Sequence, residues 1–298
     1  MPAAACRIAG LGVKQTRQVL VDPPGGPDKR LEKVMTTRRC FIVTVTAAGA
    51  VALLPRRGNT QDDGGDNVFE TESGQIVVYP VHHASLVMET PAGVIYVDPV
   101  GDPARYADLP DPDLILITHE HGDHYAPETL AEIAGPATQM IANPVVYDML
   151  PRDLQAKTQQ ISNGEEKDAL GIQIEAVPAY NITEGRLDYH PKGRDNGYVL
   201  NIDERRVYFA GDTEGTEEMR GLEDIFLAFV PMNLPFTMDA EQAASAVADF
   251  APQYVYPYHY RGRDGGTQDP QAFADMLSEA GADTEVRQAE WYEPGELE

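Results

Sequence analysis

Six consecutive residues near the middle of the chain contain three histidines and one aspartate, in the pattern His119-x-His121-x-Asp123-His124. Imidazole nitrogens and a carboxylate oxygen form a ligand set that suits Zn²⁺ and is less suited to Mg²⁺ or Ca²⁺. In an extended segment His119 and His121 project to the same side, so both rings can reach one cation. Gly122 permits a turn that brings Asp123 and His124 to a second position nearby. The motif therefore predicts a metal centre.

The elements that must position this motif can be read from the apolar runs around it. The motif follows Leu114–Ile117, a continuous apolar run that is typical of a strand buried on both faces. Asp239 and Asp269 are placed to cap two later helices. Hairpins in the first half and strand–helix alternation in the second predict one α/β domain. The predicted strands are 76–79, 85–88, 94–97, 114–117, 172–177, 198–202, 207–210, 225–230 and 254–258, and the predicted helices are 127–134, 143–150, 240–250 and 270–280.

The composition of the 298 residues narrows the classes of function. There are 48 Asp and Glu against 23 Lys and Arg, a net charge of −25. The negative electrostatic field of so acidic a chain repels the phosphate backbones of nucleic acids, so nucleic acid is not an expected partner. Both cysteines, Cys6 and Cys40, precede the predicted domain, which excludes a thiolate metal site or a disulfide within it.

The motif at the end of a buried strand resembles the metallo-β-lactamase-fold hydrolases, and the resemblance extends over about residues 74–292. It implies a four-layer αββα sandwich with one or two metal ions between the sheets. Asp212, in the sequence AGDT, matches the aspartate that bridges two metals, and His259, in YPYH, matches the last histidine ligand. His83 and Asp98, in HAS and VDP, resemble landmarks of the branch with ascorbate-phosphate lactonase and the lipid-cleaving phosphodiesterases.

One position departs from the pattern of that family. Where the resemblance implies a histidine after the strand near residue 178, this chain has Asn181, and the nearest imidazole is His190. An amide oxygen is a poor zinc ligand beside imidazole, which favours His190, carried to the site by a loop. The alternative is that His190 only caps a loop and that the first site keeps two histidines.

The resemblance implies two sets of ligands and a mechanism. His119, His121 and His190 would hold one Zn²⁺, and Asp123, His124 and His259 a second, with Asp212 shared; Mn²⁺ or Fe are alternatives. A hydroxide bridging the two ions would be the nucleophile, with Asp123 holding it in line. Asp98 is a candidate acceptor for the N–H of a ligand histidine, and His83 a candidate wall of the site. Glu120 points away and has no predicted role.

The substrate class is indicated only by charge. Lys192 and Arg194 follow His190, and Arg261 and Arg263 follow His259. Cations gathered beside a metal site in so acidic a chain favour an anionic small molecule, so we expect a hydrolase of an anionic ester, lactone or phosphodiester. The alternative for these side chains is that they neutralise surplus carboxylates at the rim. The alternative for the function is iron-dependent oxygen chemistry of the persulfide dioxygenase kind.

The first 73 residues have a different composition from the rest. Residues 1–57 contain ten Lys and Arg but three Asp and Glu, and they include Arg38-Arg39 before an uncharged run to Leu54. That pattern resembles a twin-arginine export signal, and the run is too short to span a bilayer. We therefore expect a leader over 1–57, a linker over 58–73, a hydrolase domain over 74–298, and export, with a cytoplasmic protein as the alternative. Cell fractionation with Arg38→Lys, Arg39→Lys tests this, since unprocessed cytoplasmic wild-type protein would contradict it.

Overall fold

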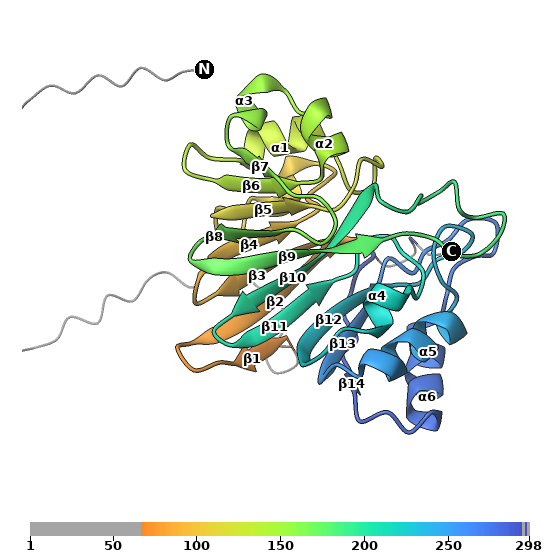
Figure 1. Cartoon of the computed structure of the whole chain (residues 1–298). Helices are drawn as coiled ribbons and strands as arrows, with labels where there is room; N and C mark the ends of the chain where they lie inside the picture. The colour runs from red at the N-terminus through yellow and green to blue at the C-terminus, as the bar shows by residue number, and fades with distance from the viewer. Residues whose placement is uncertain (1–66, 294–295, 297–298) are drawn as a thin grey trace, which may run out of the picture. The chain divides into compact units, whose positions relative to one another are not determined.

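The computed structural model describes residues 67–293 and 296, so the predicted export signal and most of the predicted linker lie outside the described residues. Two seven-stranded sheets form the described part of the chain (Figure 1). The first sheet has its strands in chain order: β1 (Val68–Glu70), β2 (Gln75–His82), β3 (Ser85–Thr90), β4 (Gly93–Val97), β5 (Leu114–Ile117), β6 (Gln139–Ala142) and β7 (Thr158–Gln160). Strands β1 to β4 pair antiparallel, and β4 to β7 pair parallel.

The second sheet repeats this plan. Its strands are β8 (Glu166–Ala169), β9 (Ile172–Ala179), β10 (Asp195–Ile202), β11 (Arg205–Phe209), β12 (Ile225–Pro231), β13 (Tyr254–Tyr258) and β14 (Glu285–Val286). Strands β8 to β11 pair antiparallel, and β11 to β14 pair parallel. Because parallel neighbours need crossover connections, helices occur only in the parallel half of each sheet.

Helices cover the outer faces of the two sheets. The first sheet carries the 3₁₀ helix η1 (Pro103–Tyr106) with α1 (Pro127–Ile133), α2 (Pro144–Met149) and α3 (Arg152–Gln155), and the second carries α4 (Glu217–Arg220), α5 (Ala240–Phe250) and α6 (Pro270–Glu279). Asp239 and Asp269 accept hydrogen bonds from backbone N–H groups at the starts of α5 and α6, as predicted. The predicted αββα sandwich is confirmed.

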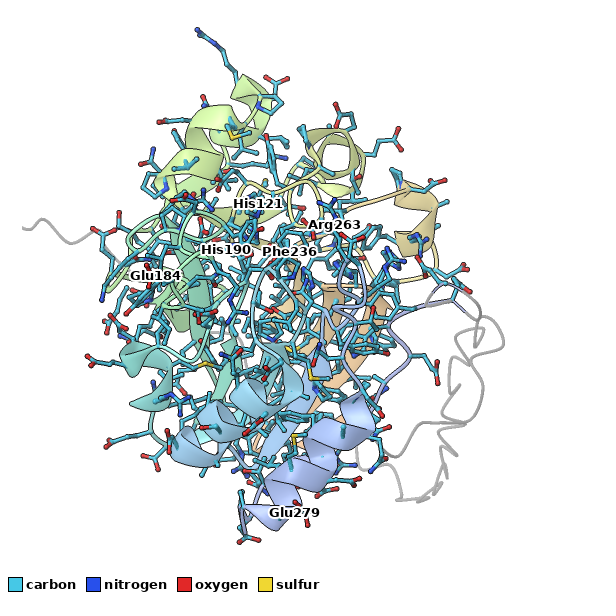
Figure 2. The ribbon with its side chains drawn as sticks, turned by 90° about the vertical axis from the view of Figure 1, so that its right-hand side faces the viewer. His121, Glu184, His190, Phe236, Arg263 and Glu279 are labelled. Carbon is cyan, nitrogen blue, oxygen red and sulfur yellow. The ribbon has the colours of Figure 1, made fainter. Side chains whose placement is uncertain are left out.

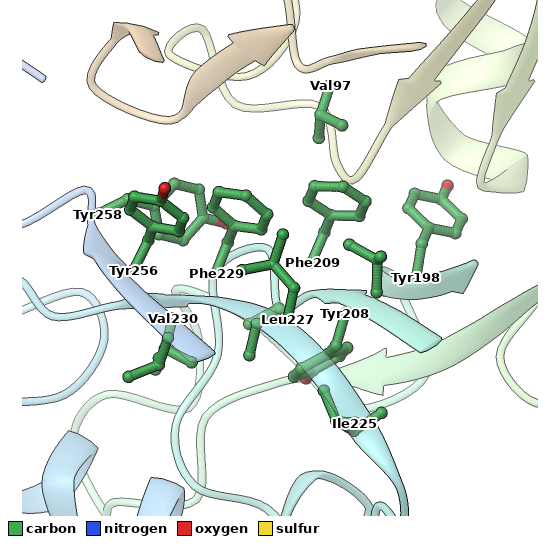
Figure 3. Close-up of a cluster of buried hydrophobic side chains, with 14 of the residues drawn as sticks. Val97, Tyr198, Tyr208, Phe209, Ile225, Leu227, Phe229, Val230, Tyr256 and Tyr258 are labelled. Carbon is green, nitrogen blue, oxygen red and sulfur yellow. The ribbon is translucent and has the colours of Figure 1, made fainter. Parts of the chain in front are cut away.

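Aromatic rings from neighbouring parallel strands fill the space between the sheets. Phe209 of β11 stacks on Phe229 of β12 at 5.0 Å, and Phe229 stacks on Tyr256 of β13 at 5.2 Å. Figure 3 shows these rings pointing towards Val97 of the opposite sheet, while Tyr208 points the other way. This alternation follows from the two-residue period of a strand. The stack fixes the register of the strands whose ends carry the candidate site.

The domain begins earlier than expected, because β1 lies within the predicted linker. Phe69 is 3% exposed and packs on the rings of Tyr254 and Tyr256. Its strand is only three residues long, with Phe69 buried between a half-buried Val68 and an exposed Glu70, so the strand is defined by pairing with β2 rather than by a local pattern. Within the described residues, no helix is long and apolar enough to cross a membrane.

Candidate metal centre

The site lies where strands of both sheets end at one edge of the sandwich. His119 follows β5, Asp212 follows β11 and His259 follows β13, and each of these strands belongs to the parallel half of its sheet. Gly211, with a φ of +63°, turns the chain towards Asp212; a Cβ there would lie 3.0 Å from a backbone oxygen and 3.1 Å from the Thr118 side chain. Only glycine fits this close approach between the sheets.

Asp212 lies at the centre of the cluster. Its Oδ1 is 3.3 Å from Nε2 of His124 and 3.4 Å from Nε2 of His259, and its Oδ2 is 3.4 Å from Nε2 of His190. The residue is 3% exposed, and its Oδ1 has no hydrogen-bond partner among the described residues. A buried carboxylate oxygen without a partner is costly, and a bound cation removes that cost. The donor set therefore fits a metal.

The remaining predicted ligands lie on either side of Asp212. Nε2 of His119 is 3.1 Å from Nδ1 of His121, and the ligand atoms of these two residues and His190 all lie within 4.8 Å of one another. On the other side, Nε2 of His259 is 3.1 Å from Nε2 of His124 and 3.3 Å from Oδ2 of Asp123. The seven predicted ligands thus lie close together. The groups whose ligand atoms are all within 4.8 Å of one another differ in part from the two predicted ones: His119, His121 and His190; His119, His124 and Asp212; and Asp123 and His259 with His83, which the sequence placed only in the wall of the site.

Outward contacts orient four of the five ligand rings. In three of these rings Nδ1 faces an oxygen that can accept its proton and Nε2 is left for a cation, an arrangement typical of metal-binding histidines; in His259, Nδ1 faces the side-chain nitrogen of Asn233. The four contacts are His119 with Thr118 Oγ1 at 3.0 Å, His124 with Asp98 Oδ2 at 2.8 Å, His190 with Asp195 Oδ2 at 3.1 Å, and His259 with the Asn233 side-chain amide at 2.9 Å.

Asp98 occupies the supporting position predicted for it. It is fully buried and contacts Nδ1 of His124, while its two oxygens also accept hydrogen bonds from the backbone N–H and the hydroxyl of Thr118. Its φ of +45° is uncommon for a residue other than glycine, and such backbone strain gathers at functional sites. One carboxylate thus ties the end of β5 to a ligand ring.

Asp195 was missed by the sequence analysis. It begins β10, contacts Nδ1 of His190 and accepts two hydrogen bonds from Arg194, at 2.7 and 2.9 Å. Arg194 also pairs with Glu120 at 3.0 Å. Arg194 therefore supports His190 through Asp195, and the ion pair of Glu120 with Arg194 lies outside this series of contacts. The available signal was an acidic residue five positions after a candidate ligand.

The departure at Asn181 is resolved by the loop that follows it. The backbone N–H of Asn181 donates to the carbonyl of His190 at 2.8 Å, which closes a loop and returns the chain to the cluster. The Asn181 side chain donates to the carbonyls of Arg186 and Phe236, while its Oδ1 has no partner among the described residues. His190 lies in a cluster of candidate ligands with His119 and His121.

The cations predicted to recognise an anion are mostly engaged elsewhere. Lys192 pairs with Glu218 at 3.0 Å, Arg194 with Asp195 at 2.7 Å, and Arg261 with Glu296 at 3.1 Å. These pairs agree with the alternative interpretation, in which the cations neutralise carboxylates. Arg263 is exposed and makes no ion pair with the described residues, and Figure 2 labels it in the same region of the molecule as His121 and His190.

The pKa values of two candidate ligands, His119 and His190, are shifted in opposite directions. Burial holds the pKa of His119 well below its usual value, so that ring is neutral and ready to bind a cation. Burial also acts to lower the pKa of His190, but hydrogen bonds to Asp195 and Asp212 outweigh it and raise the pKa to about 9. A metal that binds His190 must therefore displace a proton at neutral pH.

An αββα sandwich with this cluster at the sheet edge defines a metal-dependent hydrolase of the metallo-β-lactamase superfamily. The family model described as "Beta-lactamase superfamily domain" matches residues 77–259. Among curated proteins, the UPF0173 metal-dependent hydrolase of Methanopyrus kandleri is 32% identical over 220 residues, 68% of this chain and 92% of that protein. The chain belongs to this family of metal-dependent hydrolases.

Solved structures agree with this assignment. A candidate metal-dependent hydrolase from Parabacteroides distasonis is 40% identical, with a TM-score of 0.65 over 76% of this chain and 98% of that one. Igni18, a metallo hydrolase from Ignicoccus hospitalis, is 25% identical, with a TM-score of 0.60 over 73% of this chain and 96% of that one. These two similarities support a metal-dependent hydrolase and indicate no substrate. Membership of the branch with ascorbate-phosphate lactonase stays a prediction.

Proposed function

We propose that the protein holds two metal ions, Zn²⁺ in the first instance, and hydrolyses an ester, lactone or phosphodiester bond of a small molecule. The observation that carries the proposal is the position of Asp212, whose two oxygens face histidines of both ligand groups. A carboxylate between two groups of imidazoles is suited to sharing by two cations. The lack of any thiolate in this part of the chain agrees with a hydrolytic His/Asp site.

Different residues would orient the metal ligands and the attacking water. When bound, the metal ions supply Lewis acidity, which activates water and polarises the carbonyl or phosphoryl oxygen of the substrate. Asp98, Asp195 and Asn233 hold the ligand rings from outside. The Asp123 side chain is 47% exposed, so its carboxylate faces the open side of the cluster, where it can orient an attacking water and accept its proton.

The surroundings of the cluster support a substrate with an apolar part. Tyr189 adjoins His190, and its ring packs edge-on against Phe236 at 5.0 Å. On the same loop the side chains of Ile182 and Leu187 are 55% and 46% exposed. Large apolar residues exposed on a loop that ends at a candidate ligand, in so acidic a chain, favour an apolar group in the substrate. Arg263, which is exposed and makes no ion pair with the described residues, is the candidate contact for the predicted anionic group.

A screen with metal analysis tests this function. Purified protein, loaded separately with zinc, manganese and iron, is assayed against chromogenic phosphodiesters, lactones, thioesters and a cephalosporin. We expect two equivalents of metal and turnover of a phosphodiester, lactone or ester that the Asp212→Ala variant does not catalyse. Stoichiometric iron with oxygen uptake and no hydrolysis would instead establish the alternative, iron-dependent oxygen chemistry.

A further inference from the structure

His83 lies beside the second ligand group and can play one of two roles there. It is in the turn between β2 and β3, is 8% exposed, and its ring centre is 3.8 Å from that of His259. Its Nε2 lies 3.4 Å from Oδ2 of Asp123, which is a long distance for a hydrogen bond. With a lone pair at Nε2, His83 would be a further metal ligand. With a proton at Nε2, it would donate to Asp123.

The contacts of the other ring nitrogen decide between these roles. Nδ1 of His83 is 2.7 Å from the hydroxyl oxygen of Tyr292, and that oxygen accepts a hydrogen bond from the backbone N–H of Arg261 at 3.1 Å. The hydroxyl proton of Tyr292 is then free to donate to Nδ1. The opposite assignment leaves that proton without an acceptor among the described residues. A neutral ring that accepts at Nδ1 carries its proton at Nε2.

Asp123 is the predicted ligand that most needs such a donor. Its side chain is 47% exposed, whereas that of Asp212 is 4% exposed and faces three histidines. Asp123 contacts two ring nitrogens, one from His259 and one from His83. If His259 binds the metal, His83 is left to fix the orientation of this carboxylate.

The segment that carries Tyr292 is firmly attached to the site. Trp291 is 1% exposed, and its carbonyl accepts a hydrogen bond from the backbone N–H of His83 at 3.0 Å. The guanidinium of Arg261 lies 5.4 Å from the centre of the Tyr292 ring and pairs with Glu296. Arg261, predicted to contact substrate, thus holds this segment instead.

We propose that Tyr292 fixes His83 in the tautomer with its proton at Nε2, and that His83 then positions Asp123 as a ligand of the second metal. The hydrogen bonds run in one direction, from the backbone of Arg261 to Tyr292, to His83 and to Asp123. Trp291 and Tyr292 are therefore part of the metal centre, although they lie beyond the region that the family model matches.

Zinc affinity of the full chain tests the proposal without recourse to activity. Tyr292→Phe removes the hydroxyl alone, and Tyr260→Phe is the matched control, because its ring packs on Tyr292 at 4.9 Å outside the hydrogen-bonded series. Calorimetry with a competing chelator should show the second zinc bound about 10–100-fold more weakly in Tyr292→Phe, with the first zinc and the control unchanged. An unchanged second zinc in Tyr292→Phe overturns the proposal.

Two further measurements test the proposal even if Tyr292→Phe does not fold. ¹⁵N NMR of the histidine rings in the zinc-loaded wild type should show the His83 proton at Nε2, and a proton at Nδ1 overturns the proposal. His83→Gln keeps an N–H donor whereas His83→Leu does not. Both variants place a residue other than glycine at the same backbone φ of +56°, so the comparison isolates the loss of the donor. The second zinc should stay bound in His83→Gln and weaken about 10–100-fold in His83→Leu. Equal losses would make His83 a ligand.

Discussion

Replacing Asp212 with alanine is expected to lower hydrolysis by about a thousandfold or more, equivalent to about 4 kcal/mol of transition-state stabilisation. The reason is that Asp212 is the one predicted ligand with an oxygen towards each group of histidines. Without it, two cations would be held close together with no shared negative charge between them. Metal content by elemental analysis should fall together with the rate.

Glu120→Ala is the matched control for that variant. Glu120 lies between two predicted ligands in the sequence, but its side chain pairs with Arg194 at 3.0 Å. Arg194 keeps its two hydrogen bonds to Asp195 when Glu120 is removed, so His190 stays oriented. We expect a loss of less than about tenfold, in line with a partly exposed ion pair. Losses of similar size in the two variants would refute the ligand assignment.

Replacing His190 with alanine is expected to reduce the bound metal from two equivalents to one and the rate by about a hundredfold or more. His190 supplies the third imidazole of the first group, and its Nε2 faces Asp212 at 3.4 Å. A site left with two imidazoles and a shared carboxylate has too few ligands for tetrahedral zinc without added water. Elemental analysis and equilibrium dialysis measure the change.

Asn181→Ala separates the two candidates for that third position. Asn181 donates to the carbonyls of Arg186 and Phe236, so its removal loosens the loop, while the backbone bond to His190 remains. Two metal equivalents and a rate within about tenfold of wild type are expected. Loss of metal in Asn181→Ala with retention in His190→Ala would show that the amide, and not the imidazole, completes the first site.

The sequence was most informative where a local pattern and the final packing agree. Strands β5 and β13 and helix α5 have the predicted bounds, because their apolar residues follow the burial that the fold imposes. Four of the seven candidate ligands lie in the His119-x-His121-x-Asp123-His124 motif, whose spacing predicts a metal centre, whereas Asp212 and His259 are indicated by the family resemblance of the sequences AGDT and YPYH. His190 was favoured over Asn181 because an amide oxygen is a poor zinc ligand beside imidazole.

What could not be predicted depends on contacts between distant parts of the chain. Strands β7 and β8, with the sequences TQQ and EKDA, carry no apolar alternation and exist because a neighbouring strand offers hydrogen bonds. Tyr292 lies 209 positions from His83 in the sequence, so nothing local connects the two. The pairing of Arg194 and Arg261 with carboxylates likewise depends on loops whose course only the folded chain shows.

The wide spacing of the candidate ligands along the sequence also determines when the metal centre can form during synthesis of the chain. His119 and its neighbours in the motif leave the ribosome well before His259, and Tyr292 follows later still. At roughly 5–20 residues per second, about 7–28 s separate the synthesis of His119 from that of His259. Until Asp212 and then His259 are synthesised, the nascent chain displays the histidines of the motif without the remaining ligands and without the aromatic stack that orders the strand ends. Loading of the paired ions is consequently a late event, which follows closure of the two sheets upon each other.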